Sequence, residues 1–189
     1  MTDVIRVLRR EHANIAALVK ALEWQINEFK KGKTPDYDII RGVMNYFLSF
    51  PDLYHHPKED LVYELLDQRD HAAAESIGDL RRQHEELAAR SRELSVGINA
   101  VLEEAQVPRE SLVRWARDFI ELQVTHMQME EEVFFPLALK TLTDDDWRSL
   151  EARMTDQEDP LFGEGVGGNF DTLREKILAW QADWLRDHA

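Results

Sequence analysis

Four histidines and two glutamates are spaced along the chain in a way that could bind a pair of metal ions. Two of the histidines are each followed by a glutamate four residues later, and residues four apart lie on the same side of a helix. Imidazole nitrogen and carboxylate oxygen together form a donor set that suits iron or manganese. The predicted ligands are His12, His55, Glu59, His84, His126 and Glu130.

The segments that carry these residues repeat each other. Residues 8–12 read Leu-Arg-Arg-Glu-His, and residues 80–84 read Leu-Arg-Arg-Gln-His. His12 precedes His55 by 43 residues, and His84 precedes His126 by 42. The chain therefore contains two copies of one half-site. We expect Glu59 and Glu130 to bridge two ions and the histidines to hold each ion at the two ends.

A buried network of histidine and glutamate without a metal is the alternative interpretation. A single His-x-x-x-Glu pair is common on helix surfaces, but here each of four predicted helices places a histidine within its apolar stripe, where an unpaired polar group is costly. The other histidines, His56, His71 and His188, are left out of the site, because His56 is rotated by about 100° from His55. Glu131 is rotated by about 140° from His126 and is expected in solvent.

The apolar residues recur every three or four positions over four long stretches, which predicts amphipathic helices over residues 5–29, 37–68, 70–104 and 109–141. Pro51 and Pro57 should bend the second helix, or end it near Phe50 and restart it. Short connections favour an all-α, up-down-up-down four-helix bundle. A short helix over about 144–154 and a further C-terminal helix capped by Asn169, with Trp180 and Trp184 on its stripe, are appended.

The length fits a single domain over residues 1–189, with the bundle at about 3–142 and a C-terminal helical extension at about 143–189. The net charge of -14 argues against a nucleic-acid partner. The chain contains no cysteine, which leaves only nitrogen and oxygen ligands for a metal. No apolar run is long enough for a membrane span and no signal peptide is visible, so we expect a cytoplasmic protein.

The set of four histidines and two glutamates resembles the hemerythrin-like family, also called the HHE cation-binding domain. The resemblance covers residues 3 to about 142, and the run from Glu130 to Leu137 is similar to that family's fourth-helix signature. It implies a non-haem di-iron centre of the Fe–O–Fe type, with manganese as the alternative. Ferritin-like proteins are excluded because no histidine here has a glutamate three residues before it.

The sequence departs from the oxygen-carrying hemerythrins, which have a fifth histidine where this chain has Ala88 and an aspartate five residues after the histidine that matches His126. The pattern is more similar to bacterial iron-centre repair proteins and iron-sensing hemerythrin domains, although the cysteine-containing region of the repair proteins is absent. Fewer protein ligands leave coordination sites for a substrate.

We therefore expect a protein that binds or reacts with dioxygen, peroxide or nitric oxide in oxidative or nitrosative stress or iron homeostasis. Whether it is an enzyme stays open; if it is, it is a di-iron oxidoreductase, and the electron donor is unidentified. The alternatives are a non-catalytic module that senses or stores iron or oxygen, and a helical interaction domain with a vestigial site. A homodimer could form through the C-terminal helix.

Overall fold

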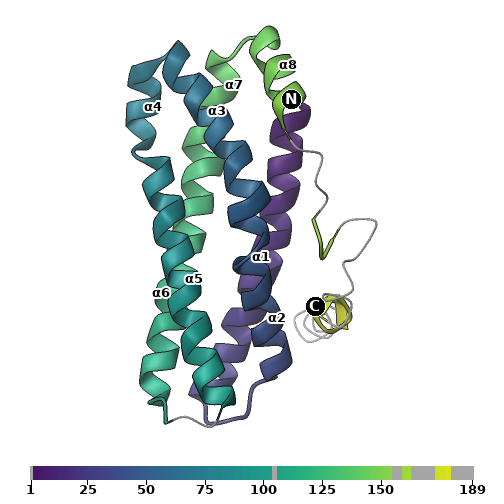
Figure 1. The fold of residues 1–189 in the computed structure, drawn as a ribbon, viewed down its shortest axis with the longest axis vertical. Coiled ribbons are helices and arrows are strands. Elements are labelled where there is room, and N and C mark those ends of the chain that lie inside the picture. The colour runs from purple at the N-terminus through teal and green to yellow at the C-terminus, as the bar shows by residue number, and fades with distance from the viewer. Residues whose placement is uncertain (1, 104–105, 155–158, 163–172, 180–189) are drawn as a thin grey trace.

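The protein is a bundle of four long helical columns (Figure 1). The computed structural model describes residues 2–103, 106–154, 159–162 and 173–179, and no strand occurs among them, which confirms the all-α prediction. The helices are α1 (Asp3–Lys30), α2 (Tyr37–Phe47), α3 (His56–Arg69), α4 (His71–Ile77), α5 (Leu80–Leu102), α6 (Arg109–Met129), α7 (Phe135–Thr141) and α8 (Asp144–Arg153), with two π-helical turns, η1 (Pro51–His55) and η2 (Glu130–Phe134).

Neighbouring columns run antiparallel, as the short connections predicted (Figure 1). The first column is α1, the second is α2 followed by η1 and α3, the third is α4 followed by α5, and the fourth is α6 followed by η2 and α7. The interruption expected near Pro51 is therefore present, and it takes the form of a π-helical turn. Each of the two π-helical turns lies beside one His-x-x-x-Glu pair.

The third column is not the continuous helix that the periodicity over residues 70–104 predicted. It is broken at Gly78, whose φ of 85° lies in the left-handed region that glycine adopts without steric cost. Asp79 then caps α5, because its carboxylate accepts a hydrogen bond from the backbone N–H of Arg82. A periodicity of three and four continues across such a break, so the apolar pattern alone did not reveal it.

The apolar core is divided into two clusters with a polar layer between them. On α1, Leu8 belongs to one cluster and Ile15 to the other, and His12 lies between them. On the fourth column, Phe119 and Phe134 belong to different clusters in the same way. Every column thus carries its predicted ligands at the level where the apolar packing is interrupted.

Two C-terminal segments pack on the bundle. The short α8 begins with a capping box formed by Thr143 and Asp146, and the Asp146 carboxylate also pairs with Arg69 of α3. Residues 173–179 are helical, with Leu173 and Ile177 buried and Lys176 paired with Asp36. The predicted positions Asn169, Trp180 and Trp184 lie outside the described residues, so a homodimer through this helix stays a prediction.

None of the helices in the described part of the chain has the length and apolar character that a membrane crossing requires.

Helices α5 and α6 approach closely at Gly97, and a substitution there tests this packing. A Cβ at position 97 would lie 2.8 Å from two ring carbons of Trp115. In an open helix, Gly→Ala stabilises by about 1 kcal/mol, whereas overpacking costs about 1–3 kcal/mol. We expect Gly97→Ala to lower the free energy of unfolding in urea, and Trp115→Leu to reverse part of that loss when both changes are combined. A more stable Gly97→Ala protein would contradict the contact.

Candidate metal centre

All six predicted ligand side chains lie in the polar layer between the two apolar clusters. The two carboxylates are fully buried, and none of the four imidazole residues is more than 7% exposed. The side chains come from all four columns: His12 from α1, His55 and Glu59 from the second column, His84 from α5, and His126 and Glu130 from the fourth column. The structure brings the set together, and its role in binding metal stays a prediction.

Glu59 directs its two oxygens to different half-sites. Its Oε1 lies 3.2 Å from Nε2 of His12 and 3.3 Å from Nε2 of His55, the two histidines of the first half-site. Its Oε2 lies 3.5 Å from Nε2 of His84 in the second half-site. The carboxylate therefore spans the two halves.

Glu130 also directs its two oxygens to different half-sites. Its Oε2 lies 3.2 Å from Nε2 of His12. Its Oε1 lies 3.1 Å from Nε2 of His126 and 3.7 Å from Nε2 of His84. Two carboxylates that each present one oxygen to each half have the arrangement required of bridges between two cations.

The atoms at the centre of this layer have no hydrogen-bond partners, although they lie close together. Both oxygens of Glu59 and of Glu130 are buried without a partner, and so is Nε2 of His12, His84 and His126. Burying such groups unpaired costs several kcal/mol, so buried charges are normally paired or coordinate a metal. Distances of 3.1–3.7 Å without hydrogen bonds indicate that the lone pairs converge on shared points between the side chains. The donor atoms of this layer therefore fit a bound cation.

The outward nitrogen of each predicted ligand histidine contacts an oxygen atom of a neighbouring side chain. An oxygen acceptor on Nδ1 fixes the proton of the neutral ring there, and it leaves the Nε2 lone pair directed inward. The four contacts are His12 with Glu131 at 2.9 Å, His55 with Glu11 at 2.9 Å, His84 with Asp60 at 3.2 Å, and His126 with Gln83 at 3.1 Å.

Two of these supporting residues occupy the same position in the sequence repeat. Glu11 and Gln83 each precede the histidine that ends the repeated five-residue segment. Each contacts the histidine of the His-x-x-x-Glu pair in its own half, Glu11 contacting His55 and Gln83 contacting His126. The repeat is the sequence signal for this supporting position, which the spacing of the histidines and glutamates alone does not reveal.

The neighbouring carboxylates raise the pKa values of two of the histidines. Burial opposes the charged form of His12, but Glu130, Glu131 and Glu59 outweigh it and raise its pKa to about 12. Burial likewise opposes the charge on His84, whereas Asp60, Glu130 and Glu59 raise its pKa to about 11. Burial disfavours ionisation of Glu59 and Glu130 as well, yet the facing imidazoles lower both carboxyl pKa values. If no metal is bound, these side chains form an imidazolium–carboxylate cluster.

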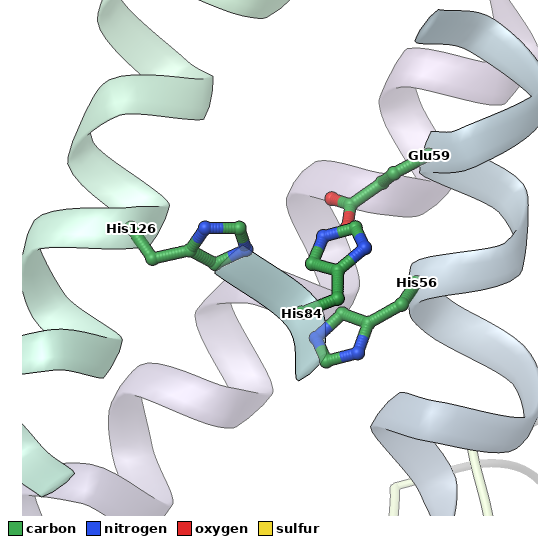
Figure 2. Close-up of side chains that lie close together, drawn as sticks. All are labelled: His56, Glu59, His84 and His126. Carbon is green, nitrogen blue, oxygen red and sulfur yellow. The ribbon is translucent and has the colours of Figure 1, made fainter. Parts of the chain in front are cut away.

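His56 was left out of the predicted site because of its rotation from His55, but its side chain lies in the same buried layer, close to Glu59, His84 and His126. His56 is only 5% exposed and its ring stacks on that of His84, with centroids 4.0 Å apart (Figure 2). It precedes Glu59 by three residues, a spacing that shares a helix face just as the four-residue spacing of His55 does. The rotation of His56 from His55 alone does not reveal this relation to Glu59. Burial lowers the pKa of His56 to about 4.

The sequence predicted that Glu131 lies in solvent, but its side chain is partly buried and makes two polar contacts. Its side chain is 33% exposed, and its two oxygens accept from Nδ1 of His12 and from Nε of Arg9. It lies within the π-helical turn η2, where the residue positions differ from those of a regular α-helix.

Comparison with known families gives one match over most of the chain. The model of the hemerythrin HHE cation-binding domain matches residues 3–138. Comparisons with curated proteins and with solved structures found no match. The matched range contains all four columns as far as α7 and every side chain of the polar layer.

The raised pKa values of His12 and His84 make metal binding dependent on pH. Both rings are protonated at neutral pH in the metal-free chain, and a metal ion must displace those protons. We expect the affinity for a divalent cation to rise with pH, by up to roughly tenfold per pH unit for each proton displaced, and to keep rising above about pH 6.5, the value for free histidine.

Calorimetric titration in two buffers of different ionisation enthalpy measures the protons released. His71→Gln, which removes an exposed histidine on α4, is the control and should leave that number unchanged. An affinity that stays constant from about pH 7 to about pH 9, with no protons released, would show that these histidines are not displaced by metal.

Proposed function

The chain belongs to the hemerythrin HHE cation-binding family, and on that premise we propose that its polar layer holds two iron ions that bind and react with dioxygen, peroxide or nitric oxide. Such a reaction would serve protection against oxidative or nitrosative stress, or iron homeostasis. Manganese is the alternative metal. The proposed ligands are His12, His55, Glu59, His84, His126 and Glu130.

The observation that carries the proposal is the placement of the carboxylate oxygens. Glu59 and Glu130 each turn one oxygen toward His12 and the other toward His84, so each carboxylate faces both half-sites. Two buried carboxylates in this arrangement provide negative charge for a pair of cations that share both bridges.

The donor set supports iron over metals that prefer sulfur. The chain contains no cysteine, and a mixture of imidazole and carboxylate ligands suits the redox-active metals of non-haem sites. If the layer held two ferrous ions, they would supply the two electrons that reduce one peroxide, with two protons, to two water molecules. The protein's own part is to fix the imidazoles through Glu11, Asp60, Gln83 and Glu131 and to keep bulk water out of the layer.

A surface groove between α1 and α6 borders this layer at His12, and it is the entry route that we propose for a small molecule. The groove has a volume of about 530 Å³ and contains His12 among its lining residues. Most of its lining is apolar, with Ala13, Ala16, Val124 and Met127 along the two helices. The Arg9–Glu131 ion pair borders the groove beside His12. A small, uncharged oxidant fits such a passage better than a large or highly charged substrate does.

Iron analysis and rapid mixing test the proposed function. We expect the reduced, iron-loaded protein to change its electronic spectrum on mixing with at least one of dioxygen, peroxide and nitric oxide. Glu130→Gln, which cannot bridge as a carboxylate does, should lower the iron affinity by at least about tenfold. Glu132→Gln is the matched control, because Glu132 is exposed and follows two residues later.

An unchanged spectrum with all three oxidants would refute reactivity. A spectral change without consumption of the oxidant would instead assign the site to sensing or storage.

Blocking the groove should slow the reaction without removing the metal. We expect Ala16→Phe to reduce the second-order rate with the oxidant several-fold, because the ring would fill the passage toward His12. The iron content should stay at the unmodified level. Ala89→Phe places the same ring on an exposed position of α5 and is the control. Equal rates in both variants and the unmodified protein would mean that small molecules reach the layer by another route.

A further inference from the structure

His56 lies in the polar layer but has no part in the ligand set proposed above. Its ring is nearly parallel to that of His84, with an interplanar angle of 8°, and it meets the ring of His126 edge-on at a centroid distance of 6.0 Å. Figure 2 shows His56 and His84 facing each other, with Glu59 on the same side of the site. A ligand atom from each of His56, Glu59, His84 and His126 lies within 4.8 Å of the other three.

The ring nitrogens of His56 are buried and lack hydrogen bonds. Neither Nδ1 nor Nε2 has a hydrogen-bond partner among the described residues. Nδ1 does lie 3.2 Å from a carboxylate oxygen of Asp52, one turn earlier in the chain. The four proposed ligand histidines show the same pattern, with Nδ1 beside an oxygen acceptor and Nε2 directed elsewhere. The surroundings of His56 are thus those of a ligand histidine.

A purely structural role would explain the stacking but not the choice of residue. The neighbouring layers are filled by side chains such as Phe50 and Val62, which bury no polar atoms. An imidazole whose buried Nε2 has no partner costs free energy at a position where a phenyl ring would pack without that cost. The turn η1, which ends at His55, delivers His56 at the start of α3, so both consecutive histidines are buried.

We infer that His56 is a third imidazole ligand of the metal ion held by His84 and His126. The inference rests on the proposed function, since it assumes a metal in this layer. It makes the two ions different, because His12 and His55 alone provide imidazoles to the other ion. The oxygen-carrying hemerythrins have a fifth histidine at the position of Ala88, one turn after His84. In this chain, the additional imidazole would come from His56 of α3.

His56→Phe tests the inference, because phenylalanine keeps an aromatic ring against His84 but offers no nitrogen. His71→Phe is the matched control, since His71 is exposed on α4. We expect the unmodified protein and the control to bind two divalent ions per chain in titrations against a chelator. His56→Phe should lose affinity for one of the two ions by more than about 100-fold, exceeding the usual effect of a supporting residue.

X-ray absorption spectroscopy provides a measurement that does not depend on activity. The number of imidazoles per metal should be lower in His56→Phe than in the control. Circular dichroism of the metal-free variants verifies the helical fold, and His56→Gln replaces the phenylalanine variant if that one does not fold.

Equal affinities and equal imidazole counts in the variant and the control would overturn the inference and leave the proposed dinuclear site intact. Failure of the unmodified protein to bind two ions would overturn the proposed function, and the inference with it.

Discussion

The burial of two ionised carboxylates between two apolar clusters is the constraint on which the rest of this structure depends. Glu59 and Glu130 have no exposed surface, and nothing within the described residues hydrogen-bonds to their oxygens. Charge in such a place must be compensated by nearby positive charge. Four columns contribute to this purpose, because each can direct only a few side chains into a single layer. The bundle architecture follows from that requirement as much as from its apolar packing.

The residues around the polar layer also compensate one another's charges. The rings of His12, His55 and His84 are oriented by carboxylates, and that of His126 by an amide. Two of the carboxylates are themselves paired with cations: Glu11 with the buried Lys58, and Glu131 with Arg9. Charge thus alternates from the centre of the layer toward the surface. An arrangement of this kind holds the ring orientations before any ligand arrives.

The sequence predicted the columns and the convergence of six side chains, because both depend on regular helical spacing. Apolar periodicity located the helices, and the His-x-x-x-Glu spacing identified pairs that share a helix face. It did not predict the break at Gly78, since a positive φ at one residue leaves the apolar pattern unchanged. It also misjudged His56 and Glu131. Their positions depend on neighbouring columns and π-helical turns, and spacing along one ideal helix contains neither kind of information.

The two π-helical turns make the two repeated halves of the molecule structurally different. One turn ends at His55, ahead of its glutamate, whereas the other begins at Glu130, after its histidine. One half therefore has His56 and Asp52 beside the layer, and the other has Glu131 and Arg9. A molecule with two identical atoms would meet unlike surroundings at its two ends. If such a molecule bound across the layer, the unequal charges around its two ends would favour an uneven distribution of its electrons.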